Sequence, residues 1–179
     1  SQNSMELAGR TLGLLGFGRI GRAVAHMAEA IGMRVIVSDP LHEESVSFDE
    51  LFETSDVLSL HVPATPQTVG MIDASVLARM PRGSILVNCA RGPVVVNDDL
   101  VAALESGHLA GAGLDVTDPE PLGPDHPLLH MENVIVTPHI ASNTTAGRER
   151  MERMAFEQVR MALAGARPTQ LLNPEVWKD

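Results

Sequence analysis

The fold of this chain is decided by one stretch near its beginning, TLGLLGFGRIG, which occupies residues 11–21. The first half of the stretch is apolar and predicts a strand over Thr11–Gly16, of the kind that is buried in a parallel sheet. The second half opens an amphipathic pattern that predicts a helix over Arg19–Ile31, ended by Gly32. Three glycines with the spacing G-x-G-x-x-G, at residues 16, 18 and 21, span the junction of the two elements and predict a tight turn from strand into helix.

The three glycines have separate expected roles in a dinucleotide site. Gly16 permits the tight turn, Gly18 lets the backbone approach a pyrophosphate, and Gly21 lets the helix and the strand pack closely. The amides of Arg19 and Ile20 then point at the phosphates from the helix N-terminus, where the helix dipole favours an anion. A G-x-G-x-x-G motif alone can also be no more than a tight turn.

An acidic residue follows the second strand, which is predicted over Met33–Ser38. Asp39 lies at the spacing where a carboxylate receives the ribose hydroxyls of the adenosine half of a dinucleotide. It would repel the 2′-phosphate of NADP, and no arginine immediately follows it, so the sequence favours NAD. A solvated turn at Asp39-Pro40 is the alternative, and the glycine motif upstream makes the cofactor the better interpretation.

The rest of the chain alternates apolar runs with helical patterns, which is typical of parallel strands joined by crossover helices. We therefore predict an α/β fold, a Rossmann-type doubly wound parallel sheet in a single domain over residues 1–165, with a C-terminal tail over 166–179. At most a minimal extra strand fits around Val46. The further predicted strands are Asp56–His61, Ser84–Cys89, Ala110–Val116 and Asn133–Thr137. The further predicted helices are Phe48–Phe52 (capped by Ser47), Ala74–Met80, Asn97–Ser106 (capped by Asn97) and Thr144–Ala164. We expect the last of these helices to close the sheet.

Composition excludes several classes of protein. The chain has 179 residues, 44% of them hydrophobic, and a formal net charge of −10, which argues against binding to nucleic acid or to an anionic membrane. No apolar run is long enough to span a bilayer. The single cysteine, Cys89, cannot form an internal disulfide, which fits a cytoplasmic location. We expect no metal site.

Polar residues follow three further predicted strands. Arg91 comes after the strand that ends in Asn88-Cys89, Asp115 and Glu120 lie at and after the end of the next, and His139 follows the last. In an open α/β sheet the ligand lies beyond the carboxyl ends of the strands, so these side chains are expected to converge. Each of them taken alone is equally consistent with an ordinary surface residue.

With these motifs in this order, the chain resembles the D-isomer-specific 2-hydroxyacid dehydrogenases from about Leu7 to Trp177. The resemblance implies that Arg91 binds the substrate's carboxylate and 2-oxo oxygen. It also implies that His139 is the general acid–base and that Glu120 accepts a hydrogen bond from its other ring nitrogen. Asp115 would receive the nicotinamide carboxamide of NAD.

The resemblance implies further contacts to the cofactor. The loop His61-Val62-Pro63 would border the adenine, mainly through backbone and packing. Cys89 is interpreted as a small buried residue rather than a nucleophile. The remaining cofactor contacts implied by the resemblance come from Val62, Pro63, Cys89, Ala90, Arg91, His139 and Ala141.

Relatives in this family carry an N-terminal stretch that forms a substrate domain together with the C-terminal tail, and we expect roughly 100 residues of it to be missing here. The chain would then supply one wall of the active-site cleft and be inactive by itself. The partners expected are a small 2-hydroxy or 2-oxo acid and a second copy in a homodimer. An NAD(H)-sensing, co-repressor-like protein is the alternative from another class. Glu120 argues against formate, and the motifs do not name the acid.

Overall fold

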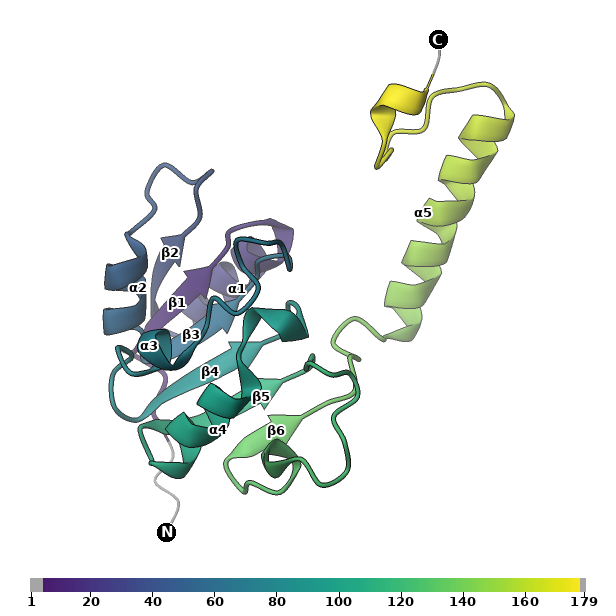
Figure 1. Cartoon of the computed structure of the whole chain (residues 1–179). Helices are drawn as coiled ribbons and strands as arrows, with labels where there is room; N and C mark the ends of the chain where they lie inside the picture. Colours follow the sequence, from purple (N-terminus) through teal and green to yellow (C-terminus); the bar gives the residue numbers. More distant parts are fainter. Residues whose placement is uncertain (1–4, 178–179) are drawn as a thin grey trace. The chain divides into compact units, whose positions relative to one another are not determined.

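The structure, a computed structural model, describes residues 5–177. Six parallel strands form one sheet in the order β2-β1-β3-β4-β5-β6 (Figure 1). The predicted α/β Rossmann-type sheet is therefore confirmed, with the order reversing between β1 and β3. The strands are β1 (Thr11–Leu15), β2 (Arg34–Ser38), β3 (Val57–Leu60), β4 (Ser84–Asn88), β5 (Leu109–Leu114) and β6 (Val134–Val136).

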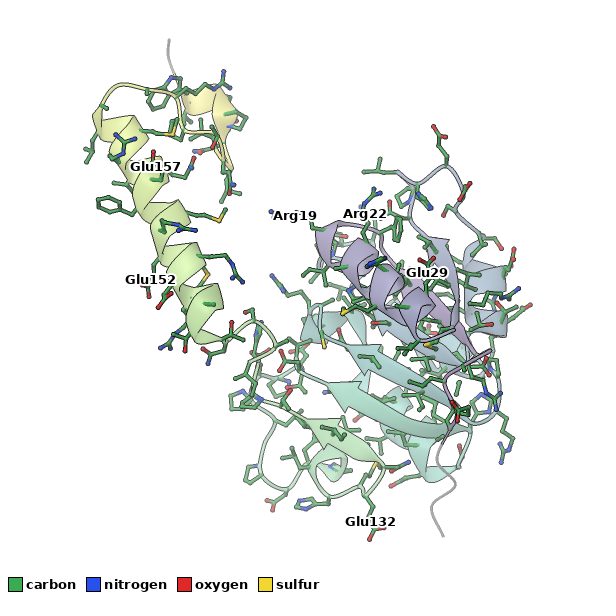
Figure 2. All side chains as sticks on the ribbon, turned by 180° about the vertical axis from the view of Figure 1, so that it is seen from behind. Arg19, Arg22, Glu29, Glu132, Glu152 and Glu157 are labelled. Atoms are coloured by element: carbon green, nitrogen blue, oxygen red, sulfur yellow. The ribbon has the colours of Figure 1, made fainter. Side chains whose placement is uncertain are left out.

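Helices follow most strands and lie on both faces of the sheet (Figures 1 and 2). One apolar core is built by α1 against β1 and β2, and a larger one by α2, α3 and α4 on the other face. Short 3-10 turns complete the connections. The bounds are α1 (Arg19–Ala30), α2 (Phe48–Thr54), α3 (Ala74–Leu77), α4 (Asn97–Glu105), α5 (Thr145–Leu163), η1 (Gly92–Val94), η2 (Pro127–Leu129) and η3 (Pro174–Val176).

One local prediction, that for Asn97, differs from the structure. At most a minimal strand was expected around Val46; no strand is present there, and the Val46 amide donates to the Val37 carbonyl over 2.8 Å. Asn97 was expected to cap α4 but is its first residue, and Val96 precedes the helix. The Asn97 side-chain amide instead donates to the carbonyl oxygen of Asp118 over 2.6 Å, so a contact distant in sequence outcompetes the cap. Ser47 does cap α2, because its hydroxyl accepts from the Glu50 amide over 3.1 Å.

The turn between β1 and α1 requires glycine at two positions. Gly16 has φ +97°, and a Cβ there would lie 2.8 Å from the carbonyl oxygen of His61. A Cβ on Gly21 would lie 2.5 Å from the carbonyl oxygen of Gly16, so the first turn of α1 can approach the strand only without a side chain. The glycine motif thus brings the start of α1 and the end of β3 against the end of β1.

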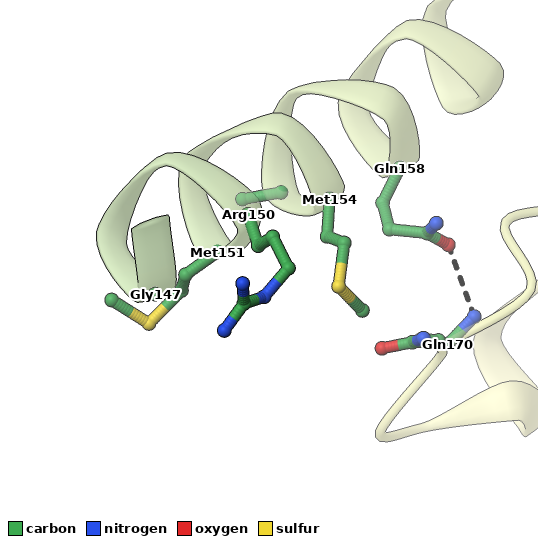
Figure 3. Close-up of a pocket in the computed structure, with 7 residues that line it drawn as sticks. Gly147, Arg150, Met151, Met154, Gln158 and Gln170 are labelled. Atoms are coloured by element: carbon green, nitrogen blue, oxygen red, sulfur yellow. Dashed lines mark hydrogen bonds between the residues drawn. The ribbon is translucent and has the colours of Figure 1, made fainter. Parts of the chain in front are cut away.

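The chain divides into two compact units, residues 1–139 with the sheet and residues 140–179 with α5 and the tail. α5 belongs to the second unit. Its expected closure of the sheet and the expected boundary at 165/166 both stay predictions. Within the second unit, Gln158 of α5 accepts a hydrogen bond from the amide of Gln170 over 3.0 Å. Figure 3 shows Met151, Met154 and Gln158 lining a shallow pocket with Gln170. No residue of α5 is buried.

Candidate functional site

The residues expected to bind a ligand lie at one edge of the sheet, where the parallel strands end. This arrangement follows from the topology, because all six strands point the same way. The edge collects Gly16 after β1, Asp39 after β2, His61 after β3, Arg91 after β4, Asp115 after β5 and His139 after β6. No helix within residues 5–177 is long and apolar enough to cross a membrane. The same residues contain no group of three or more His, Cys, Asp or Glu side chains able to hold a metal ion.

Asp39 is fixed against the glycine turn by two backbone amides. Phe17 N donates to Asp39 Oδ2 over 2.6 Å, and Leu41 N donates to Asp39 Oδ1 over 2.8 Å. These hydrogen bonds, that of Phe17 first, hold the pKa of Asp39 below its ordinary value, and the nearby charges of His42 and Arg22 add to the effect. The carboxylate is therefore ionised at neutral pH and retains lone pairs for two ribose hydroxyls.

The start of α1 has the open space that a pyrophosphate needs. A Cβ placed on Gly18 would meet no atom within 4 Å, so the backbone there is open to a ligand. Arg19 and Ile20 are the first two residues of α1, and the first amides of a helix have no partner within it. The residues present therefore fit a dinucleotide pyrophosphate.

The loop after β3 borders the same turn. The His61 carbonyl and the Val62 side chain are the nearest neighbours of the space beside Gly16, and Val62 is half-buried whereas Pro63 is exposed. Ser59 Oγ lies 3.0 Å from His61 Nε2. Burial lowers the pKa of His61, so its ring is neutral at neutral pH. The loop is placed to border an adenine, and that role stays a prediction.

Asp115 joins the ends of three strands. It is 5% exposed, and its Oδ1 accepts from the Thr137 hydroxyl over 2.6 Å. Its amide donates to the carbonyl of Asn88 on β4, and its carbonyl accepts from the amide of His139, both over 2.9 Å. The backbone of Asp115 is thus fixed by β4 and His139, and its buried carboxylate, which accepts from Thr137, is well positioned to accept from a ligand amide.

His139 and Glu120 form the hydrogen bond expected from the sequence. Nδ1 of His139 lies 2.7 Å from Oε1 of Glu120, and both side chains are about half exposed. Because the carboxylate can only accept from a ring N–H, Nδ1 carries the proton and Nε2 remains for exchange with a substrate. His139 has φ +54°, a conformation that side-chain-bearing residues rarely adopt.

Arg91 presents a guanidinium without a carboxylate partner. Its Nη1 donates to the Ala90 carbonyl over 2.6 Å, and among residues 5–177 no ion pair involves Arg91. The next residue, Gly92, packs directly against the carbonyl of Thr117. Arg91 is thereby tied to the loop that carries Glu120 and keeps donors available for an anion.

These features have close counterparts among known proteins. Residues 1–141 match the family described as D-isomer specific 2-hydroxyacid dehydrogenase, NAD binding domain. The chain belongs to this family.

Two similar relatives of the 2-hydroxyacid dehydrogenase family are a glyoxylate reductase of Korarchaeum cryptofilum and a D-3-phosphoglycerate dehydrogenase of Mycobacterium leprae. The first is 45% identical over 182 residues, 97% of this chain and 55% of the relative. The second is 42% identical over 174 residues, 92% of this chain and 33% of the relative. The chain thus spans about half the length, or less, of these curated relatives.

Solved structures agree with the sequence comparison. The TT0316 protein of Thermus thermophilus superposes with a TM-score of 0.90 and 48% identity, over 95% of this chain and 56% of that one. An NAD-complexed D-isomer specific 2-hydroxyacid dehydrogenase of Lactobacillus delbrueckii ssp. bulgaricus gives a TM-score of 0.89 and 33% identity, over 95% and 58% of the two chains. NAD is therefore the cofactor of the family to which this domain belongs.

Two predicted cofactor residues of this dehydrogenase domain need comment. Cys89 was expected to be buried but is exposed, while Ala90 is buried. Cys89 is the first residue after β4, and its side chain is exposed whereas those of Asn88 and Ala90 are buried. Partial desolvation, and then the charge of Asp115, raise the pKa of the Cys89 thiol, which disfavours a nucleophilic thiolate. Ala141 belongs to the second unit, and its contact with the cofactor stays a prediction.

The structure also adds residues that the sequence analysis missed. The buried Asn88 amide donates to the Arg91 carbonyl and accepts from the Ala90 amide, each over 3.0 Å, so it shapes the turn that carries Arg91. Thr137 donates to Asp115 as described. A polar residue closing an apolar strand was the available signal at both positions, because a buried amide or hydroxyl needs partners.

Proposed function

We propose that this chain is the cofactor-binding domain of an NAD-dependent oxidoreductase that interconverts a D-2-hydroxy acid and its 2-oxo acid. The His139–Glu120 hydrogen bond of 2.7 Å carries the proposal. It is an acid–base pair at the same sheet edge as the glycine turn and Asp39, and a dinucleotide site by itself has no need of one.

Each side chain of the proposed site has a separate role in the reaction. NAD, when bound, supplies the hydride chemistry. Arg91 binds the carboxylate and the 2-oxo oxygen of the acid, which fixes the substrate and polarises its carbonyl. During oxidation His139 accepts the hydroxyl proton at Nε2, and it returns this proton during reduction. Glu120 stabilises the imidazolium that forms, and Asp115 holds the nicotinamide carboxamide.

The substrate class follows from the catalytic residues and from the names of the relatives, a glyoxylate reductase and a D-3-phosphoglycerate dehydrogenase. The test is calorimetric titration of this chain with NADH, and then a panel of glyoxylate, 3-phosphoglycerate and D-lactate assayed through NADH absorbance. The panel uses the chain joined to a substrate domain, because this domain alone forms only one wall of the active-site cleft. One wall cannot hold the acid at reacting distance from the nicotinamide or exclude water. Failure to bind NADH, or turnover of none of the acids by the completed protein, would overturn the proposal.

We further propose that the chain acts in the cytoplasm as a homodimer. Its acidic composition and single cysteine fit a reducing compartment, and the dimer is implied by the family resemblance. Sedimentation equilibrium tests the dimer, and a monomer at high micromolar concentration would contradict it. No observation favours the NAD(H)-sensing alternative.

A further inference from the structure

The loop that carries Glu120 has few backbone donors of its own. Residues 118–121 are exposed and lie between the buried side chains of Thr117 and Leu122. Two of these four residues are prolines, which have no N–H group, so a regular backbone ladder cannot hold the segment. Polar groups can therefore hold this backbone chiefly through its carbonyl oxygens.

Asn97 provides one of these hydrogen bonds. Its Nδ2 donates to the carbonyl oxygen of Asp118 over 2.6 Å. Among the described residues, one other hydrogen bond reaches a carbonyl of this segment: the Thr117 hydroxyl donates to Pro119 over 2.9 Å, a contact inside the loop itself. Asn97 thus ties the segment to the rest of the domain at a point two residues before Glu120.

The backbone around Asn97 is anchored in the core. Asn97 is the first residue of α4, and the fourth residue of that helix, Leu100, is fully buried. On the other side of Asn97, the amide of Val96 donates to the carbonyl of Ile72 over 3.0 Å. Because the chain is held on both sides of Asn97, its side-chain amide fixes the loop relative to the core.

His139 is held independently of this loop. Its amide donates to the carbonyls of Asp115 and Thr137, over 2.9 and 3.0 Å. The distance of 2.7 Å between Nδ1 of His139 and Oε1 of Glu120 therefore depends on where the loop places Glu120. Both side chains are about half exposed, so packing around the carboxylate does not fix it. A small shift of the loop would weaken this hydrogen bond steeply.

We propose that Asn97 is a positioning residue for the acid–base pair: its hydrogen bond to the Asp118 carbonyl holds Glu120 where it accepts from Nδ1 of His139. The inference rests on the proposed function, in which a proton on Nδ1 leaves Nε2 for exchange with the substrate. It also accounts for an asparagine at the start of α4. An aspartate would serve a helix start at least as well, but an ionised carboxylate cannot donate.

The test compares Asn97→Asp with the natural chain. Aspartate keeps the size of the side chain and suits the first turn of a helix, but it removes the donor and places an oxygen against the Asp118 carbonyl. In an isotope-labelled chain at mildly alkaline pH, proton–nitrogen correlation spectra report which ring nitrogen of His139 carries the proton. Glu120→Ala defines the tautomer ratio without the carboxylate. We expect the ratio of the Nδ1–H to the Nε2–H tautomer to fall roughly two- to tenfold in Asn97→Asp, as for the loss of one hydrogen bond.

Asn133→Asp is the matched control. Asn133 also donates its side-chain amide to a backbone carbonyl, that of Ala110, over 3.2 Å. It precedes β6, whereas His139 follows the other end of that strand, so the control should leave the tautomer ratio unchanged. Asn97→Ala should act as Asn97→Asp does, which separates the loss of the donor from the added charge. Circular dichroism checks that each variant is folded.

An unchanged tautomer ratio in either Asn97 variant, or an equal fall in Asn133→Asp, would overturn the inference while the proposed function stands. The proposed function would itself fail if the natural chain held the proton mainly on Nε2, because the hydrogen bond that carries it would then be absent in solution. In the completed protein, Asn97→Asp should lower kcat and keep the KM of the acid, since Arg91 rather than Glu120 binds the acid. A raised KM with an unchanged kcat would contradict the positioning role.

Discussion

Gly92→Ala tests how the loop that carries Glu120 is held against the turn that carries Arg91. A Cβ at Gly92 would overlap the carbonyl of Thr117 and lie 2.9 Å from the backbone nitrogen of Asp118. Both neighbours are backbone, so neither can rotate away and the loop itself must move. Overpacking of this kind costs about 1–3 kcal/mol, and we expect a loss of unfolding free energy near the upper end of that range.

Urea unfolding followed by circular dichroism measures the change, since the one tryptophan, Trp177, belongs to the second unit and not to the unit that contains the sheet. Gly113→Ala is the matched control: Gly113 lies on β5, and a Cβ there would meet no atom within 4 Å. The control should change stability by no more than about 1 kcal/mol. Equal effects of the two substitutions would refute the argument that the packing of Gly92 on Thr117 holds the loop.

Three further predictions concern the site. In a protein that contains the substrate domain, His139→Ala and Arg91→Ala should each lower turnover, and the loss for His139, the acid–base residue, should be roughly 10²–10⁴-fold. Both variants should still bind NADH in a calorimetric titration. A near-normal rate in either variant would exclude the substituted residue from the mechanism. Burial lowers the pKa of His61 from 6.5, so the unfolded chain binds the proton first and the unfolding free energy should fall as the pH drops below about 6.5. His61→Gln should flatten this dependence, as measured by urea unfolding at several pH values, and an unchanged slope would contradict the assignment. This chain alone should bind NADH yet show at most a few per cent of the turnover of the completed protein; comparable rates in a parallel assay would place the acid entirely on this domain.

The cofactor half of the site was predictable because its signals are local. Gly16, Gly18 and Gly21 are close in sequence, and Asp39 follows the next strand, so their geometry is set by one strand–turn–helix–strand unit. The hydrogen bond between His139 and Glu120 was expected from the family resemblance, and the structure contains it.

Contacts between distant segments could not be predicted in the same way. Asn97 has the right chemistry for a helix cap, and only the folded chain brings the Asp118 carbonyl close enough to compete for its side-chain amide. The packing of Gly92 on Thr117 likewise joins two loops that no spacing rule connects. For α5, the helical pattern indicates the element without identifying what it packs against, and no residue of the helix is buried.

The left-handed backbone conformation of His139 lowers the stability of the fold at a residue that is proposed to act in the reaction. With φ +54°, a residue bearing a Cβ loses roughly 1–2 kcal/mol relative to the right-handed region, while the His139 amide is held by the carbonyls of Asp115 and Thr137. Glycine would relieve this cost and remove the imidazole. A laboratory selection that rewards heat resistance alone would therefore tend to discard the residue proposed as the acid–base, whereas one that rewards turnover would retain it in a less stable fold.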